Sequence, residues 1–115
     1  KISNLIFKIN DKQNDIFFEM DVLPFVNKKN NELNINVFVN GKYNNSLKFK
    51  FEKNLKSKKN RKVVFKIKKE NIINNTINIE FKNENPISPL DLFLSPDSRQ
   101  LGFLLLKFNL LKKYI

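Results

Sequence analysis

The sequence predicts an all-β domain: a two-sheet antiparallel β-sandwich of about seven strands. Apolar residues recur at every second position in successive short segments, and no segment shows a convincing helical stripe. An Asn-Gly pair also separates two of these segments, which is a strong signal for a β-hairpin. Strands with one apolar face usually bury it between two packed sheets. The strand order stays open between a jelly roll and an immunoglobulin-like arrangement, with a closed barrel as the alternative.

Each expected strand has one apolar face, and lysine, asparagine or a carboxylate fills most of the alternate positions. The residues expected to face the core are, in chain order, Leu5, Phe7 and Ile9; Ile16, Phe18, Met20 and Val22; Leu33, Ile35, Val37 and Val39; Leu47, Phe49 and Phe51; Val63, Phe65 and Ile67; Ile77, Ile79 and Phe81; and Leu106, Phe108 and Leu110. This alternation is typical of strands with one buried and one wet face.

The connections are predicted from turn residues. Asn40-Gly41 predicts that the strands at about 33–39 and 43–53 pair antiparallel. In SPLDLF, Ser88 is a candidate cap and Pro89 a candidate first residue of a single helical turn. Segments rich in lysine and asparagine are expected to be turns or loops, namely 27–31, 54–61 and 71–75.

Length and composition limit the classes of function. A chain of 115 residues fits one domain spanning 1–115. It contains neither cysteine nor histidine, which excludes a disulfide framework and argues strongly against zinc and copper sites. No nucleophile motif or glycine-rich phosphate loop is present, so we expect no catalysis and no cofactor. The chain opens at Lys1 rather than at methionine, and we expect it to be a piece of a longer protein.

The net charge of +11 raises the question of an anionic partner. Twenty lysines and twenty asparagines beside two arginines are also what an AT-rich genome encodes. Nucleic-acid binders more often use arginine, which argues against that partner. The runner-up function is nevertheless a basic module for anionic lipid or nucleic acid. The candidate patch is Lys56, Lys58, Lys59, Arg61, Lys62, Lys66 and Lys68. The alternative to a binding patch is that these residues belong to a solvated loop and to the water-facing side of a strand.

Three aromatic residues fall on outward positions or near turns, namely Phe17, Phe38 and Tyr43. Exposed aromatic rings stack on sugars or bases. An outward phenylalanine more often lies under a neighbouring loop or a partner domain. Both interpretations stay open from the sequence.

The segment 82–103 holds three of the four prolines and one of the two arginines. Prolines stiffen a connection by restricting the unfolded chain. Arginine offers five donors in a fixed plane, so Arg99 is expected to pin this loop through Asp97 or Asp91. The alternative is that Arg99 holds an anionic sugar or a phosphate.

This last third resembles the end of a β-sandwich accessory domain that is attached to bacterial glycosyltransferases and other cell-surface polysaccharide enzymes. The family shows a strand, an Asn-Pro (here Asn85-Pro86), a Ser-Pro, an Asp-x-Arg-x-Leu-Gly (here 97–102) and a last amphipathic strand. An upstream V-x-V-N-G hairpin, here 37–41, fits as well, and the resemblance covers roughly residues 33–110.

The resemblance implies a non-catalytic domain that works beside the catalytic domain of its own parent chain. It also implies a cytoplasmic location, with contact to polysaccharide and peripheral contact with the inner membrane kept open. The residues expected to bind a ligand or to pin loops are Asp97, Arg99, Asn85 and Asn40.

Overall fold

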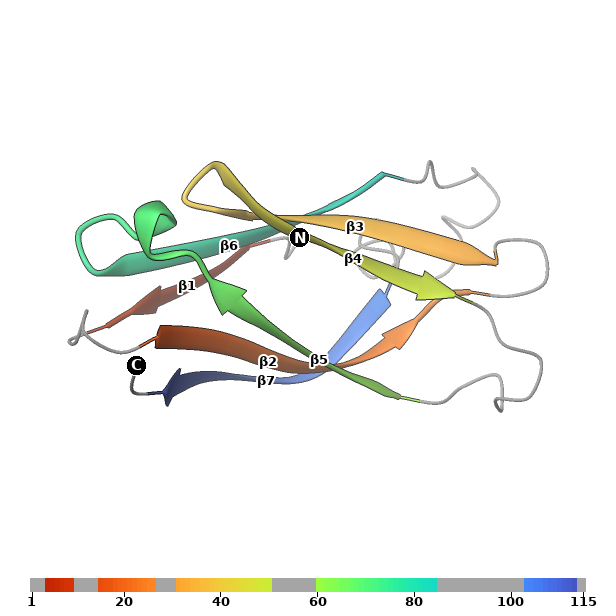
Figure 1. The fold of residues 1–115 in the computed structure, drawn as a ribbon. Coiled ribbons are helices and arrows are strands. Elements are labelled where there is room, and N and C mark those ends of the chain that lie inside the picture. Colours follow the sequence, from red (N-terminus) through yellow and green to blue (C-terminus); the bar gives the residue numbers. More distant parts are fainter. Residues whose placement is uncertain (1–3, 10–14, 27–30, 51–59, 85–102, 114–115) are drawn as a thin grey trace.

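The computed structural model describes residues 4–9, 15–26, 31–50, 60–84 and 103–113. Seven strands of this part form two sheets that pack face to face (Figure 1), which confirms the predicted β-sandwich. The elements are β1 (Asn4–Lys8), β2 (Asp15–Pro24), β3 (Glu32–Val39), β4 (Lys42–Lys50), β5 (Arg61–Ile67), the short 3-10 helix η1 (Lys69–Asn71), β6 (Thr76–Asn83) and β7 (Phe103–Lys113).

The two sheets have the strand orders β1-β6-β3-β4 and β5-β2-β7, and all neighbours are antiparallel. In an immunoglobulin-like sandwich several consecutive strands are neighbours in one sheet. Among the described strands, β3 and β4 are the only consecutive strands that are neighbours in one sheet. Every other connection between the described strands leads to the opposite sheet. The order is that of a jelly roll, in which a long hairpin is rolled up across two sheets.

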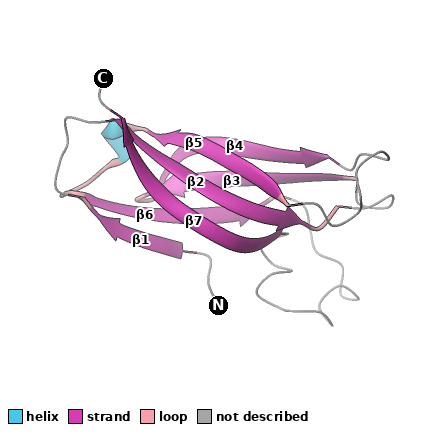
Figure 2. Ribbon diagram, turned by 90° about the horizontal axis from the view of Figure 1, so that it is seen from below, coloured by secondary structure: helices cyan, strands magenta, loops and turns pink. Residues whose placement is uncertain are grey.

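The rolled hairpin is visible in the strand pairs. The tip is β3 paired with β4; next comes β2 with β5 in the other sheet, and then β1 with β6 in the first sheet. The pairs thus alternate between the sheets while their members move apart in the sequence. Figure 2 shows the result from below: β4 and β5 lie along one long margin, while β1 and β6 lie on the other side, beside β7.

The hairpin at Asn40-Gly41 is confirmed. Asn40 has a φ of 51° and Gly41 a φ of 80°, and β3 and β4 pair antiparallel on either side. Two consecutive positive φ angles are those of a type I′ turn, whose twist matches that of the flanking strands. Asparagine and glycine tolerate this conformation best, so the local sequence fixes the turn and with it the pairing.

The core consists mainly of the alternating residues that the sequence predicts. Among the described residues, sixteen buried apolar side chains from both sheets form one cluster, and fifteen of them belong to the predicted inward set. Its centre is aromatic, because the Phe18 ring of β2 lies 5.4 Å from Phe65, 6.0 Å from Phe7 and 6.3 Å from Phe81 between centroids. Side chains from three other strands therefore meet on one residue of β2.

The predicted inward face of β7 is wrong at one position. Val22 of β2 pairs with Leu105, whereas Asp21 pairs with Lys107, so Leu106 is an extra residue in a β-bulge. The bulge shifts the inward positions, and Leu106 is 44% exposed. Phe103, which the predicted pattern omits, is fully buried. Phe108 keeps its inward position opposite Met20 but is 42% exposed because β7 lies at a sheet edge.

None of the described segments forms a helix with the length and apolar character that crossing a membrane requires. The helical turn expected at 88–93 lies outside the described residues, as does the predicted core residue Phe51.

Candidate functional site

Six of the eleven predicted site residues lie outside the described part of the chain. These are Asn85, Asp97 and Arg99 of the proline-containing loop, together with Lys56, Lys58 and Lys59 of the basic patch. Asn40 and the other members of the patch, Arg61, Lys62, Lys66 and Lys68, are described.

Asn40 makes intramolecular contacts through its whole amide group. Its Nδ2 donates to the carbonyl oxygens of Asn71 and Thr76, both at 2.8 Å, and its Oδ1 accepts from the backbone N–H of Asn78 at 3.2 Å. The side chain thus ties the β3–β4 turn to η1 and β6. With three partners already in place, Asn40 serves to pin the hairpin, and little of its hydrogen-bonding capacity is left for a ligand.

Two buried asparagines that the sequence analysis did not single out continue this network. Asn44 is 2% and Asn71 3% exposed. Asn44 Nδ2 donates to the Lys66 carbonyl at 3.0 Å, and Asn44 Oδ1 accepts from the Lys68 N–H at 2.9 Å. Asn71 Nδ2 donates to the Tyr43 carbonyl at 3.2 Å. These bonds join β4 to β5 and η1, so side chains close this margin of the sandwich.

Asn44 points inward because it is the extra residue of a second bulge. Val37 pairs with Asn45 and Phe38 with Tyr43, which leaves Asn44 without an opposite residue on β3. The adjacent asparagines at 44 and 45 interrupt the apolar alternation of this strand, and that interruption is the signal in the sequence that indicates a bulge.

Arg61 closes the same margin at its other end. Its Nη2 donates to the carbonyl oxygen of Lys50, the last residue of β4, at 2.8 Å. Arg61 therefore links the first residue of β5 to the opposite sheet. In a chain with twenty lysines, an arginine at this position indicates that a directed hydrogen bond matters more than the charge alone.

Replacing Arg61 with lysine is expected to lower the free energy of unfolding by about 1 kcal/mol, because the ammonium cannot reproduce the directed bond to the Lys50 carbonyl. Urea unfolding followed by circular dichroism measures the difference. The control is Lys62→Gln, which removes an exposed ion pair and should change stability by less than about 0.5 kcal/mol. If Arg61→Lys were as stable as the unmodified domain, the positive charge of Arg61, and not its directed hydrogen bond, would account for its contribution to stability.

The described lysines of the basic patch each lie near a carboxylate or an aromatic ring. Lys62 lies 3.8 Å from Glu19, and Lys66 lies 3.5 Å from Asp15, in each case between Nζ and a carboxylate oxygen. Lys68 lies over the Tyr43 ring, with Nζ 5.8 Å from the centroid. The side chains of these lysines are exposed, but they do not form a surface of uniform positive charge.

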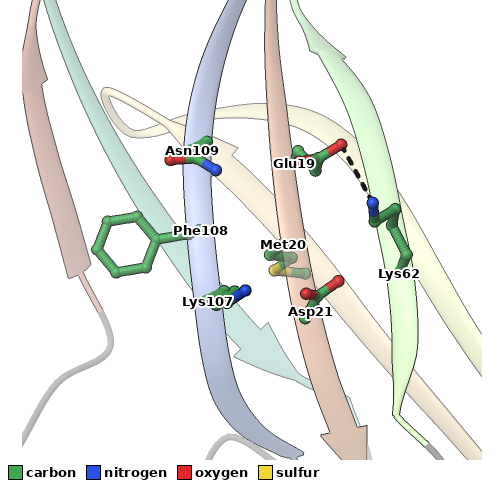
Figure 3. A pocket seen from close by; sticks show the side chains of 7 residues that line it. All are labelled: Glu19, Met20, Asp21, Lys62, Lys107, Phe108 and Asn109. Carbon is green, nitrogen blue, oxygen red and sulfur yellow. Dashed lines mark ion pairs between the residues drawn. The ribbon is translucent and has the colours of Figure 1, made fainter.

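A hollow on the outer face of the β5-β2-β7 sheet has the same mixed character. Figure 3 shows Glu19 and Asp21 of β2 between Lys62 of β5 and Lys107 of β7, with Asn109 further along β7. Two carboxylates beside two ammonium groups leave no net charge to attract a phosphate. The hollow therefore offers no anion site.

The outer face of the other sheet carries the aromatic pair Phe38 and Tyr43, whose ring centroids lie 6.0 Å apart in an edge-to-face arrangement. Tyr43 Oη and Ser46 Oγ are 2.7 Å apart, and Ser46 Oγ donates to Asn36 Oδ1 at 2.7 Å. Lys82 covers the Phe38 ring, with Nζ 4.8 Å from its centroid. This surface combines aromatic and hydrogen-bonding groups, as sugar-binding surfaces do.

On this outer face one carboxyl group has a perturbed titration. Asn34 Nδ2 donates to Glu32 Oε1 at 3.3 Å, and Lys48 Nζ lies 3.6 Å from the same oxygen. The hydrogen bond and the nearby ammonium lower the pKa of Glu32 from its ordinary value. The resulting stabilisation is present above the unfolded-state pKa and is lost as the pH falls through the folded-state value. Glu32 is solvent-accessible, so this effect on stability is small.

The margin opposite to β4 and β5 is apolar and open. The Phe108 ring of β7 points toward β1 (Figure 3) and lies 5.8 Å from the Phe7 ring. Phe108 and Leu106 remain 42% and 44% exposed. We call Phe7, Leu106 and Phe108 the β7 seam. Phe7 is partly buried, whereas Leu106 and Phe108 are exposed.

No family model matches this chain, and no curated protein or solved structure shows a significant similarity to it.

Proposed function

We propose that this domain is a non-catalytic accessory domain of a bacterial enzyme that builds cell-surface polysaccharide, and that it packs against another part of its own parent chain. The resemblance of residues 33–110 to such accessory domains suggests the enzyme class. The β7 seam supports the mode of action. It places two exposed apolar side chains, Leu106 and Phe108, on one edge strand.

The charge distribution favours this function over an anion-binding one. Lys62 and Lys66 pair with carboxylates of β2, and the hollow beside them is charge-balanced. Specific recognition of a phosphate backbone relies on unpaired cations that release counterions. The described part of the basic patch therefore supports binding to lipid or nucleic acid less well than the seam supports binding to protein.

The test uses the longer polypeptide that carries this domain. Replacing Leu106 with serine should reduce sugar transfer by that polypeptide several-fold, because the seam would no longer hold the domain against its neighbour. Val64→Ser on β5 is the matched control, since Val64 is exposed to a similar extent, 47%, at the opposite margin. Unchanged transfer by Leu106→Ser, with both variants folded, would refute the proposed contact.

Direct contact with glycan is a second candidate, favoured by the Phe38–Tyr43 pair and its chain of hydroxyl and amide groups. An amide-shift titration with acidic and neutral oligosaccharides tests it, with a DNA duplex as the charge control at low and physiological salt. Glycan binding predicts salt-tolerant shifts around Tyr43 that Tyr43→Ala abolishes. Shifts that DNA produces equally and that salt removes would indicate charge attraction alone.

A further inference from the structure

The rolled hairpin leaves one strand position vacant among the described residues. From the tip outward, β3 pairs with β4, β2 with β5 and β1 with β6. The next pair in this series joins β7 to a strand that precedes β1. On its other side β7 already pairs with β2, and no described strand pairs with its outer edge. In a complete jelly roll that edge is occupied.

The side chains of β7 show what kind of strand fits this edge. After the bulge, Phe108 and Leu110 face inward opposite Met20 and Phe18. Lys107 and Asn109 face outward, and no described carboxylate forms an ion pair with Lys107. An added strand with apolar residues inward and acidic residues outward would cover Phe108 and place a carboxylate beside Lys107.

A second copy of the domain fits this edge poorly. Each copy carries a net charge of +11, so pairing two β7 edges brings like charges together. Addition of a strand from the parent polypeptide avoids this repulsion. Its backbone would pair with the N–H and C=O groups of the edge that no described strand occupies, and its alternate side chains would supply specificity.

We propose that the outer edge of β7 is completed by an extended segment of the parent polypeptide that lies ahead of β1, runs antiparallel to β7, and alternates apolar with acidic residues. This inference rests on the proposed function, because it specifies which part of the parent chain contacts the seam. Pairing is expected over the regular stretch that begins at Lys107, beyond the bulge.

The test adds such a strand in front of the 115-residue chain. A segment of about six alternating glutamate and valine residues is joined to Lys1 by a flexible Gly-Ser linker, which raises the local concentration of the strand to about the millimolar range. We expect hydrogen exchange at the β7 amides that point away from β2 to slow at least about tenfold, and the exposure of Phe108 to solvent to fall.

Two control extensions have the same length. Proline at alternate positions removes the backbone donors, and lysine in place of glutamate keeps the pairing but reverses the charge. Both should protect β7 less than the glutamate version. Unchanged exchange at β7 with all three, protection at the β4 edge instead, or dimers of the unmodified chain would each overturn the proposal.

The two proposals can fail separately. If Leu106→Ser lowers sugar transfer in the parent enzyme but the added strand leaves β7 exchange unchanged, the contact exists and is not a paired strand. If β7 is protected but Leu106→Ser leaves transfer unaffected, the strand completes the fold and the proposed function is wrong.

Discussion

Replacing Phe18 with alanine is expected to lower the free energy of unfolding by about 4 kcal/mol. Phe18 is fully buried at the centre of β2, and its ring lies between the two sheets. Alanine would remove the contacts that it makes with rings from four other strands and leave a cavity that the sheets cannot close. These rings are Phe7, Phe65, Phe81 and Phe108.

Urea unfolding followed by tyrosine fluorescence and circular dichroism measures this loss. A domain of this size is stable by about 5–15 kcal/mol, so the variant should unfold at a much lower urea concentration. Val64→Ala on the outer face of β5 is the control and should cost less than about 1 kcal/mol. A loss below about 1.5 kcal/mol for Phe18→Ala would mean that this ring is not central to the core.

Replacing Asn44 with alanine is expected to lower the free energy of unfolding by about 3 kcal/mol. The substitution would leave the Lys66 carbonyl and the Lys68 N–H without their partner, in a place where Asn44 itself is 2% exposed. An unpaired buried polar group costs about 1–3 kcal/mol. Two such groups lose their partner here, and the margin between β4 and β5 loses two of the hydrogen bonds that join it.

Asn36→Ala provides a matched control for this experiment. Asn36 also makes two side-chain hydrogen bonds, to Glu84 and Ser46, but both are exposed to water. Its loss should therefore cost less than about 1 kcal/mol. If the two asparagine variants proved equally stable in urea, burial of the Asn44 network would have no energetic consequence.

The fold class was predictable because it depends on local patterns. In six of the seven strands the period of two in the apolar residues identifies the buried face correctly, as in Ile35 and Val37 of β3. The Asn40-Gly41 pair identifies the hairpin because few other residues adopt its two positive φ angles. Strand order depends on contacts between distant segments, and the alternation pattern carries no information about those.

The bulge in β7 explains why one inward position of the seventh strand was predicted incorrectly. A bulge adds one residue and reverses the inward and outward positions beyond it. Leu106 therefore lies outside the core although it is apolar. In β4 the adjacent asparagines signal the irregularity, whereas the run of leucines before Lys107 conceals it, since every position there is apolar.

The sequence analysis expected an arginine to pin a loop through directed hydrogen bonds, and Arg61 makes such a bond although the analysis did not assign it this role. The sequence analysis expected Arg99 to pin a loop and placed Arg61 in the basic patch. The structure gives Arg61 a directed bond to the Lys50 carbonyl, while Arg99 lies outside the described residues. The positive charge of Lys62 and Lys66 is readable from the sequence. The sequence does not show that the carboxylates of Glu19 and Asp15 on β2 lie beside these two lysines.

The most direct test of the central claim compares hydrogen exchange at β7 in the 115-residue chain and in the longer parent polypeptide that we propose. If the β7 seam is a contact with the parent chain, peptides covering Leu106 and Phe108 should exchange slowly only in the longer polypeptide. Exchange at Lys42–Lys50 of β4 should be the same in both. Equal exchange at β7 in the two proteins would contradict the claim that this domain acts through its open margin.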